Sequence, residues 1–325
     1  MENRIAYLLE PGEPMQGSRY KYFELLKKCG FDVSLCRNTP EGISWIKKNK
    51  PLITVIIGDG TGTYKICQKN DIPYILIESD IMTLRKHKKS KRADLLSREK
   101  RMIHGAAKII FTSEDHQKHI CTKYGYPVEK TIVVYLRPSA KDLCFEPLSK
   151  LPGKNLVYVG GIVPWSDRRK KRGHRAYYKY FESFIKVGWK VYIYTSRNYK
   201  VTSEYISIGC IDCGKIPQGQ LYREISQYTA GFQSYNRRDA PVSSFNYCMM
   251  CRPNKLWEYL AAGIPTIGFN GGNGTGIYNG KWGVTLPDLK EKTIMKIDLP
   301  VITKEMRQGQ VIDVDAEKMK RFIFK

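Results

Sequence analysis

The sequence has no run of 18 or more apolar residues, so no segment is expected to cross a membrane. Its first apolar stretch, Ile5 to Leu9, is interrupted by Glu10 and Pro11 and is too short for the core of a signal peptide. Cysteine occurs nine times, an odd number scattered along the chain, which favours reduced thiols over a disulfide framework. We therefore expect a cytoplasmic protein that begins with a β-strand.

Acidic side chains are scarce, because 31 Asp and Glu stand against 55 Lys and Arg and the formal net charge is +24. The excess is concentrated in two segments. Residues 85–101 hold nine positive and two acidic residues, and residues 168–175 hold six positive ones. Clustered positive charge attracts a polyanion: nucleic acid, an acidic lipid surface or a phosphate-bearing substrate. The alternative is a solvated surface on a lysine-rich protein.

The order of apolar segments predicts an α/β fold. Near-continuous apolar strands separated by helices indicate a parallel sheet covered on both faces. In the first part, strands are expected at 5–9, 31–36, 52–57, 74–78, 107–112 and 131–135. After a stretch that contains prolines and glycine, the pattern restarts, with strands expected at 156–159, 189–195, 230–233 and 266–269.

A chain of 325 residues is long for one hydrophobic core and suits two domains. The relaxed stretch at 140–154 is the expected linker. The sequence thus predicts one domain at 1–145, a second at 146–312, and a tail at 313–325 whose helix returns to the first domain.

Two segments of the second half resemble a known family. One is Leu156-Val157-Tyr158-Val159-Gly160-Gly161, a strand that turns on glycines, and the other runs from Pro253 to Ile267. In this order they resemble the C-terminal domain of GT-B glycosyltransferases, in particular the retaining glycosyltransferase family 4. Residues 11–33 and 109–137 resemble parts of the N-terminal domain. The resemblance implies two Rossmann-like domains whose parallel sheets face each other across a cleft, the first binding the acceptor and the second a nucleotide-diphosphate sugar.

The second segment also has the chemistry that such a donor needs. When a sugar leaves a nucleotide diphosphate, negative charge builds up on the diphosphate, and cations and helix N-termini stabilise it. Lys255 is expected at the start of a helix, after Pro253 and Asn254, so its ammonium group and the helix dipole point at one anion. Glu258 lies one turn further on the same face, and the resemblance implies that it binds the ribose hydroxyls. A structural salt bridge is the alternative for this pair.

Further donor-binding candidates come from glycines and from the second basic segment. Gly160 and Gly161 let the backbone approach the donor closely. The family often has an arginine where Gly161 stands and a Lys-Gly pair downstream; here Arg172-Gly173 resembles the pair, and a neighbour such as Arg169 would have to replace the arginine. Gly17 belongs to the opening loop. The donor-binding residues are therefore expected to be Gly17, Gly160, Gly161, Arg169, Arg172, Asn254, Lys255 and Glu258.

One position departs from the family pattern. The glutamate that the family has eight residues before Glu258 is replaced by Met250, which cannot contact sugar hydroxyls as a carboxylate does. Arg252, with the backbone around it, is a candidate for this contact, and Asp80 is a candidate base or sugar contact. A helix N-cap is the alternative role for Asp80. A protein that binds a nucleotide sugar without turnover is the alternative for the chain.

No metal and no cofactor is expected beside the donor substrate. Two Cys-x-x-Cys pairs, Cys210 with Cys213 and Cys248 with Cys251, resemble zinc ligands in spacing within each pair. The 34 residues between the pairs exceed the usual zinc-ribbon spacing, which favours small buried or loop thiols.

The acceptor is expected to be anionic because of a run of cations: Arg85, Lys86, Lys88, Lys89, Lys91 and Arg92. This run offers no apolar face for a membrane-surface helix, but electrostatic contact with an acidic inner membrane face stays open. DNA is the second option. An enzyme that glycosylates a hydroxymethylated base has to bring the base out of the stack and binds more weakly as salt rises.

These observations predict a retaining, metal-independent glycosyltransferase with an envelope-glycan or lipid-linked acceptor. The alternatives are a DNA-modifying glycosyltransferase and a non-catalytic protein that binds nucleotide sugars or nucleic acid.

Overall fold

The structure, a computed structural model, describes residues 3–12, 18–57, 62–78, 89–165, 175–195, 199–235, 250, 254–269 and 278–324. The chain divides into two compact units. The first unit comprises Met1–Leu136 and Ile312–Lys325, and the second unit comprises Arg137–Val311. The boundary between the units thus lies after residue 136, whereas the sequence analysis placed it at 145. Among the described helices, none combines the length and the apolar character that a membrane span requires.

The first unit contains a six-stranded parallel sheet in the order β2-β1-β3-β4-β5-β6. Its strands are β1 (Arg4–Leu9), β2 (Asp32–Arg37), β3 (Ile53–Ile57), β4 (Tyr74–Glu78), β5 (Lys108–Phe111) and β6 (Thr131–Val133). Each overlaps a strand predicted from the sequence, because most of these segments are short apolar runs rich in Ile and Val.

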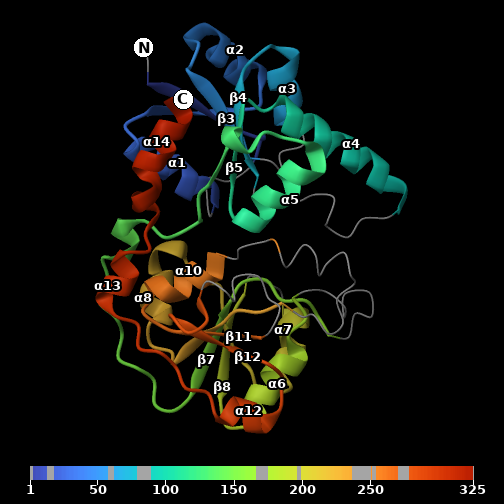
Figure 1. The fold of residues 1–325 in the computed structure, drawn as a ribbon. Coiled ribbons are helices and arrows are strands. Elements are labelled where there is room, and N and C mark those ends of the chain that lie inside the picture. Colours follow the sequence, from blue (N-terminus) through green and yellow to red (C-terminus); the bar gives the residue numbers. More distant parts are fainter. Residues whose placement is uncertain are drawn as a thin grey trace. The chain divides into compact units, whose positions relative to one another are not determined.

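Helices cover the sheet of the first unit. They are α1 (Ser18–Lys28), α2 (Pro40–Asn49), α3 (Thr63–Lys69), α4 (Lys89–Gly105), α5 (Glu114–Tyr124) and α14 (Ala316–Phe324). α1 and α14 lie side by side although they come from opposite ends of the chain (Figure 1). Met319 and Ile323 of α14 are buried in one core with residues of α1 and the sheet. The Nζ atom of Lys108 donates to the last carbonyl groups of α14, those of Phe322 and Ile323, at 2.6 and 2.9 Å. The C-terminal helix is therefore part of the first unit's core.

The second unit contains another six-stranded parallel sheet, in the order β12-β11-β10-β7-β8-β9. Its strands are β7 (Asn155–Val159), β8 (Lys190–Tyr194), β9 (Ile211–Gly214), β10 (Ala230–Phe232), β11 (Thr266–Phe269) and β12 (Gly283–Leu286). The sequence did not predict β9 and β12. Both are four-residue edge strands: β9 has no buried residue, and β12 has two buried and two partly buried residues, so neither is a continuous apolar run.

Helices pack on both faces of this second sheet as well. They are α6 (Tyr178–Lys186), α7 (Tyr199–Ile206), α8 (Leu221–Ile225), α10 (Asn254–Ala261), α12 (Glu291–Met295) and α13 (Lys304–Gln308). α6 and α12 share one core with the sheet, and α8 and α10 share another. Before α8, Gln218–Gln220 forms a 3₁₀ turn. The short connectors of the chain are the 3₁₀ turns Val128–Lys130, Ala140–Leu143 and Ile312–Asp315.

The strand order of each sheet reverses direction at one point. In the second unit the reversal lies between β7 and β10, and in the first unit it lies between β1 and β3. Open parallel sheets bind ligands outside the carboxyl ends of their strands at such a point, because the two following loops leave in opposite directions. The carboxyl ends of β7 and β10 are therefore the place to search for a site in the second unit.

Candidate functional site

A glycine turn follows β7 at this reversal point. Gly160 has a φ of +127°, a backbone conformation that disfavours any side chain. Its amide N donates to the carbonyl O of Tyr194 at 2.8 Å, which fixes the turn to the end of the neighbouring strand β8. The chain therefore turns sharply here at a residue that has no side chain of its own.

The side chain of Lys255 lies directly over this turn. A Cβ atom at Gly160 would come within 3.3 Å of Cε and 3.4 Å of Nζ of Lys255. Lys255 is the second residue of α10, so the structure brings together the glycine and the lysine that the two sequence segments singled out. A side chain at residue 160 would compete with the lysine for the same space.

An aromatic ring holds the ammonium group from a second direction. Nζ of Lys255 lies 5.1 Å from the centre of the Tyr158 ring, within the range of a cation–π contact. The Tyr158 hydroxyl in turn donates to the carbonyl O of Gly161 at 2.8 Å. Tyr158 thus ties the lysine, the strand β7 and the glycine turn into one arrangement.

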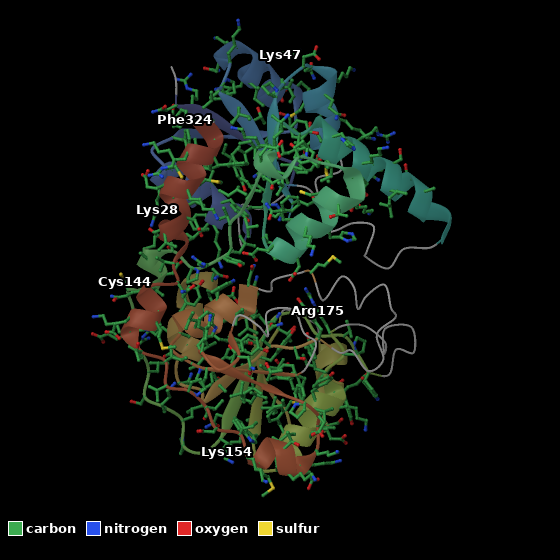
Figure 2. The ribbon with its side chains drawn as sticks, viewed as in Figure 1. Lys28, Lys47, Cys144, Lys154, Arg175 and Phe324 are labelled. Carbon is green, nitrogen blue, oxygen red and sulfur yellow. The ribbon has the colours of Figure 1, made fainter. Side chains whose placement is uncertain are left out.

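The charged form of Lys255 is disfavoured in this environment. Burial and, after it, the positive charge of Arg175 lower the pKa of Lys255 from 10.5 to about 8, while the carboxylate of Glu258 acts in the opposite direction. Arg175 lies just before α6 and is labelled in Figure 2. Two cations that destabilise each other indicate a place where an anion is accepted, because an anion between them restores the charged form.

α10 is held rigidly against the sheet, which fixes the positions of its side chains. Gly231 on β10 leaves room for the ring of Tyr259, since a Cβ atom there would overlap the ring. The Tyr259 hydroxyl donates to the carbonyl O of Phe232 at 3.1 Å and accepts from the amide N of Val159 at 3.2 Å. One buried side chain of α10 therefore bonds to both strands that flank the reversal point.

The first two turns of α10 contain the remaining described candidates on this helix. Asn254 is its first residue, and Glu258 follows Lys255 by three positions, so the lysine and the carboxylate share a face. Both side chains are partly buried. At the other end of the helix, Arg307 donates to the carbonyl O of Ala261 at 3.3 Å, a favourable position for a cation at a helix C-terminus.

In the first unit, the reversal point is occupied by a side chain of the chain itself. Glu10 directly follows β1, and its Oε1 accepts from the amide N atoms of Gly62 and Thr63 and from the Thr63 hydroxyl, at 2.8 to 2.9 Å. These hydrogen bonds lower the pKa of Glu10 against the effect of its partial burial. The sequence did not single out Glu10, since nothing in its neighbourhood shows that residues 62 and 63 come close.

The predicted site residues fall into three groups. Gly160, Gly161, Asn254, Lys255 and Glu258 lie together at the carboxyl edge of the second sheet. Lys89, Lys91 and Arg92 lie at the start of α4 in the first unit. The other predicted residues lie outside the described part of the chain: Gly17, Asp80, Arg85, Lys86, Lys88, Arg169, Arg172 and Arg252.

Sequence analysis missed two residues of the second unit's site. Tyr158 was expected only as a strand residue, although its place three residues before Gly161 and in a strand that ends on glycines was a signal. Arg175 belongs to the second basic segment, but nothing in the sequence shows that it acts on Lys255. Of the cysteine pairs, Cys210 is buried and Cys213 partly buried, while Cys248 and Cys251 lie outside the described residues. Within the described segments, no three His, Cys, Asp or Glu side chains gather as a metal site would require.

Comparisons with known proteins give matches in structure only. No protein-family model matches the sequence, and no curated protein matches it. A glycosyltransferase from Rickettsia africae is 12% identical with a TM-score of 0.64, over 100% of this chain and 99% of that one. A glycosyltransferase involved in avilamycin A biosynthesis is 11% identical with a TM-score of 0.63, over 99% and 97%.

A third structure, HepE of Anabaena in complex with UDP, is 11% identical to this chain. The match has a TM-score of 0.59 and covers 100% of this chain and 96% of HepE. Likeness at such low identity concerns the fold, and all three structures match nearly the full length. The chain therefore has the α/β fold of the GT-B glycosyltransferases, built from two Rossmann-like domains with six-stranded parallel sheets.

Proposed function

We propose that the chain is a glycosyltransferase that moves a sugar from a nucleotide-diphosphate sugar to a hydroxyl group of an acceptor. The observation that carries this proposal is the position of the Lys255 ammonium group. It lies over the bare glycine turn at the reversal point of the second sheet, one helical turn from a carboxylate. The GT-B fold and a structural neighbour in complex with UDP agree with this proposal.

Sugar transfer from a nucleotide diphosphate requires a site that stabilises an anion. The bond between the anomeric carbon and the diphosphate oxygen breaks, and the acceptor oxygen forms a new bond to the anomeric carbon and loses its proton. The nucleoside diphosphate leaves with one more negative charge. Stabilisation of that charge in a partly desolvated place lowers the barrier. In this proposal Lys255, helped by the backbone at the partly buried Gly160 and Gly161 and by the N-terminus of α10, holds the diphosphate.

Glu258 is proposed to accept hydrogen bonds from the ribose hydroxyls, because it lies on the same face of α10 as Lys255. Arg169 and Arg172 are proposed as further phosphate contacts, Gly17 as part of the donor site, and Asp80 and Arg252 as contacts to the reacting sugar. These cations are proposed to take the role that a metal ion has in other transferases. Retention of the anomeric configuration is inferred from the resemblance to family 4.

The first test is the binding of UDP, measured by isothermal titration calorimetry. Lys255→Ala and Glu258→Gln should each weaken binding at least about tenfold, because each removes a charge-assisted hydrogen bond. Lys190→Ala and Glu291→Gln are matched controls, since both residues are exposed in the second unit and Lys190 begins β8 at the opposite edge of the sheet. Equal affinity of the two test variants and the wild type would remove the basis of the proposal.

The second test is turnover. A panel of nucleotide sugars is incubated with the chain, and release of the nucleoside diphosphate is followed with and without acceptors. The proposal expects release that depends on Lys255 and increases with the right acceptor. Tight donor binding with no release under any condition would instead support a protein that binds nucleotide sugars without turnover. Met250, which stands where the family has a glutamate, would be consistent with that outcome.

The acceptor is proposed to be anionic or to lie on an anionic surface. The basic segment at 85–101 continues through α4, where Lys100 and Arg101 are exposed. Sugar transfer is compared between two acceptors: lipid-linked glycans in vesicles with acidic lipid, and duplex DNA with hydroxymethylated bases. Transfer to the lipid-linked glycan is expected, and transfer to DNA alone would favour the DNA-modifying alternative. Equal activity toward neutral soluble acceptors would contradict an anionic acceptor.

A further inference from the structure

Two segments of the chain join the units, and both contact α10. The outgoing segment, residues 137–145, begins the second unit, and the return segment, residues 303–311, ends it. Each is fixed where it meets the first unit: the carbonyl O of Leu136 accepts from Nζ of the buried Lys21 at 3.2 Å, and Ile312 is buried in the core of the first unit. Movement of either segment is therefore limited at one end by the first unit.

The outgoing segment contacts α10 through Arg137. The Cζ atom of this arginine lies 5.2 Å from the centre of the Trp257 ring, within the range of a cation–π contact. Trp257 is almost fully buried and also packs against Trp282, with 5.9 Å between the ring centres. Trp257 directly precedes Glu258, so the arginine contacts α10 at the residue next to one of the two proposed donor-binding side chains.

The return segment contacts the last turn of α10 through Arg307. Its Nη1 donates to the carbonyl O of Ala261 at 3.3 Å, and its Cδ lies 3.6 Å from the position that a Cβ atom would have at Gly263. The helix that carries Arg307, α13, lies beside α10 (Figure 1). Arg307 also contacts the outgoing segment, since its Cζ lies 5.8 Å from the centre of the Phe145 ring. One side chain thus links the end of α10 to both segments.

The two segments also border a common cavity, which has a volume of about 780 Å³. Four of its lining residues belong to the outgoing segment, among them Cys144, which is labelled in Figure 2, and four belong to the return segment. Dense packing resists movement, whereas an open volume beside two segments lets them shift. The contacts of Arg137 and Arg307 with α10 therefore restrain the segments where packing between them does not.

We propose that Arg137 and Arg307 are positioning residues of α10, and that a nucleoside diphosphate bound at the head of α10 slows the local opening of both segments. This inference rests on the function proposed above. A ligand that bonds to Lys255 and Glu258 restrains the first two turns of α10, and the cooperative hydrogen bonds of the helix extend this restraint to Ala261. Because such coupling is reciprocal, the two arginines raise the affinity of the site for the diphosphate.

The test is amide hydrogen exchange of the full chain, followed by mass spectrometry with and without saturating UDP. Exchange in residues 137–145 and 303–311 should slow about fivefold with UDP, the lower end of the coupling found between sites in proteins. Exchange in α12 should not respond, because this helix packs in the other core of the second unit. Unchanged exchange in both segments with UDP bound overturns the proposal, as does equal slowing in α12.

Variants assign the effect to the two arginines. Arg137→Gln should reduce the slowing in the outgoing segment, and Arg307→Gln that in the return segment, to less than about twofold, and each should weaken UDP binding about fivefold. Arg137→Lys and Arg307→Lys keep a cation or a donor in place and should restore part of the response. Arg223→Gln, at an exposed position on α8 of the same unit, is the matched control. A response that persists in both Gln variants contradicts the proposal.

Calorimetry with UDP separates this inference from the proposed function. UDP that does not bind the wild-type chain refutes the proposed function, and this inference with it. UDP that binds the wild type while both segments exchange at an unchanged rate refutes this inference alone.

Discussion

Raising the pH from 7 to 9 should weaken the binding of UDP about tenfold through Lys255 alone. Burial lowers the pKa of this lysine to about 8 in the free chain, and Arg175 contributes in the same direction. A diphosphate between the two cations favours the charged form, so the bound chain keeps the proton to a higher pH. Below pH 8 the lysine is already mostly charged. Above pH 8 the lysine is mostly neutral, so it takes up a proton when the ligand binds.

The magnitude follows from the fraction of free chain that is charged. With a pKa of about 8, roughly nine tenths of Lys255 is protonated at pH 7 and roughly one tenth at pH 9. The apparent dissociation constant therefore rises about tenfold between these values, with a slope that approaches one decade per pH unit. UDP itself does not cause this change, because its phosphate loses its last proton near pH 6.

The assay is calorimetric titration with UDP at pH 7, 8 and 9, in two buffers that differ in ionisation enthalpy. The difference in heat between the buffers gives the number of protons taken up, which should be near zero at pH 7 and close to one at pH 9. Lys255→Arg keeps its charge at all three pH values and should bind with a flat profile. A flat profile in the wild type, or the same slope in Lys255→Arg, would refute the reasoning.

Three other predictions concern stability and are measured by urea denaturation. Burial lowers the pKa of His116 to about 3 from 6.5, so the unfolded chain takes up a proton that the fold excludes, and this group should lower stability by about 2 kcal/mol from pH 6.5 to 5. His116→Leu should remove this contribution and leave that of His119, whose pKa burial also lowers. An equal slope in the variant and the wild type would contradict the assignment. Gly231→Ala should lower the free energy of unfolding by at least about 2 kcal/mol and weaken UDP binding, because its Cβ overlaps an aromatic ring of α10. Gly219→Ala, with open space around it, is the neutral control. Equal stability of both variants would count against this packing. Met319→Ala should lower the free energy of unfolding by about 3 kcal/mol, since α14 is part of the first unit's core. Val314→Ala, at a half-exposed position, should lower it little. A small effect of both substitutions would mean that α14 does not contribute to this core.

Most of the fold could be predicted because its central strands are apolar and its helices end at glycines such as Gly30, Gly125 and Gly263. Those glycines have positive φ, the conformation that stops a helix. The two strands that were missed, β9 and β12, lie at the edges of the second sheet, where partial exposure permits polar residues. The four residues of each of these two strands therefore give too weak an apolar pattern for sequence analysis.

The candidate site could be predicted only as far as local motifs reach. The glycine turn and the start of α10 each have a recognisable pattern, and the structure places Gly160 against Lys255. The cation–π contact of Tyr158 with this lysine and the effect of the Arg175 charge on it depend on how strands and loops far apart in sequence come together.

The central claim is that the head of α10 and the glycine turn bind the diphosphate and ribose of an activated sugar. A crystal structure of the chain with UDP tests it most directly. The account predicts a phosphate oxygen within hydrogen-bond distance of Lys255 Nζ, phosphate oxygens against the backbone at Gly160, and ribose hydroxyls bonded to Glu258. UDP bound elsewhere in the second unit, with Lys255 and Glu258 in contact with neither phosphate nor ribose, would contradict it.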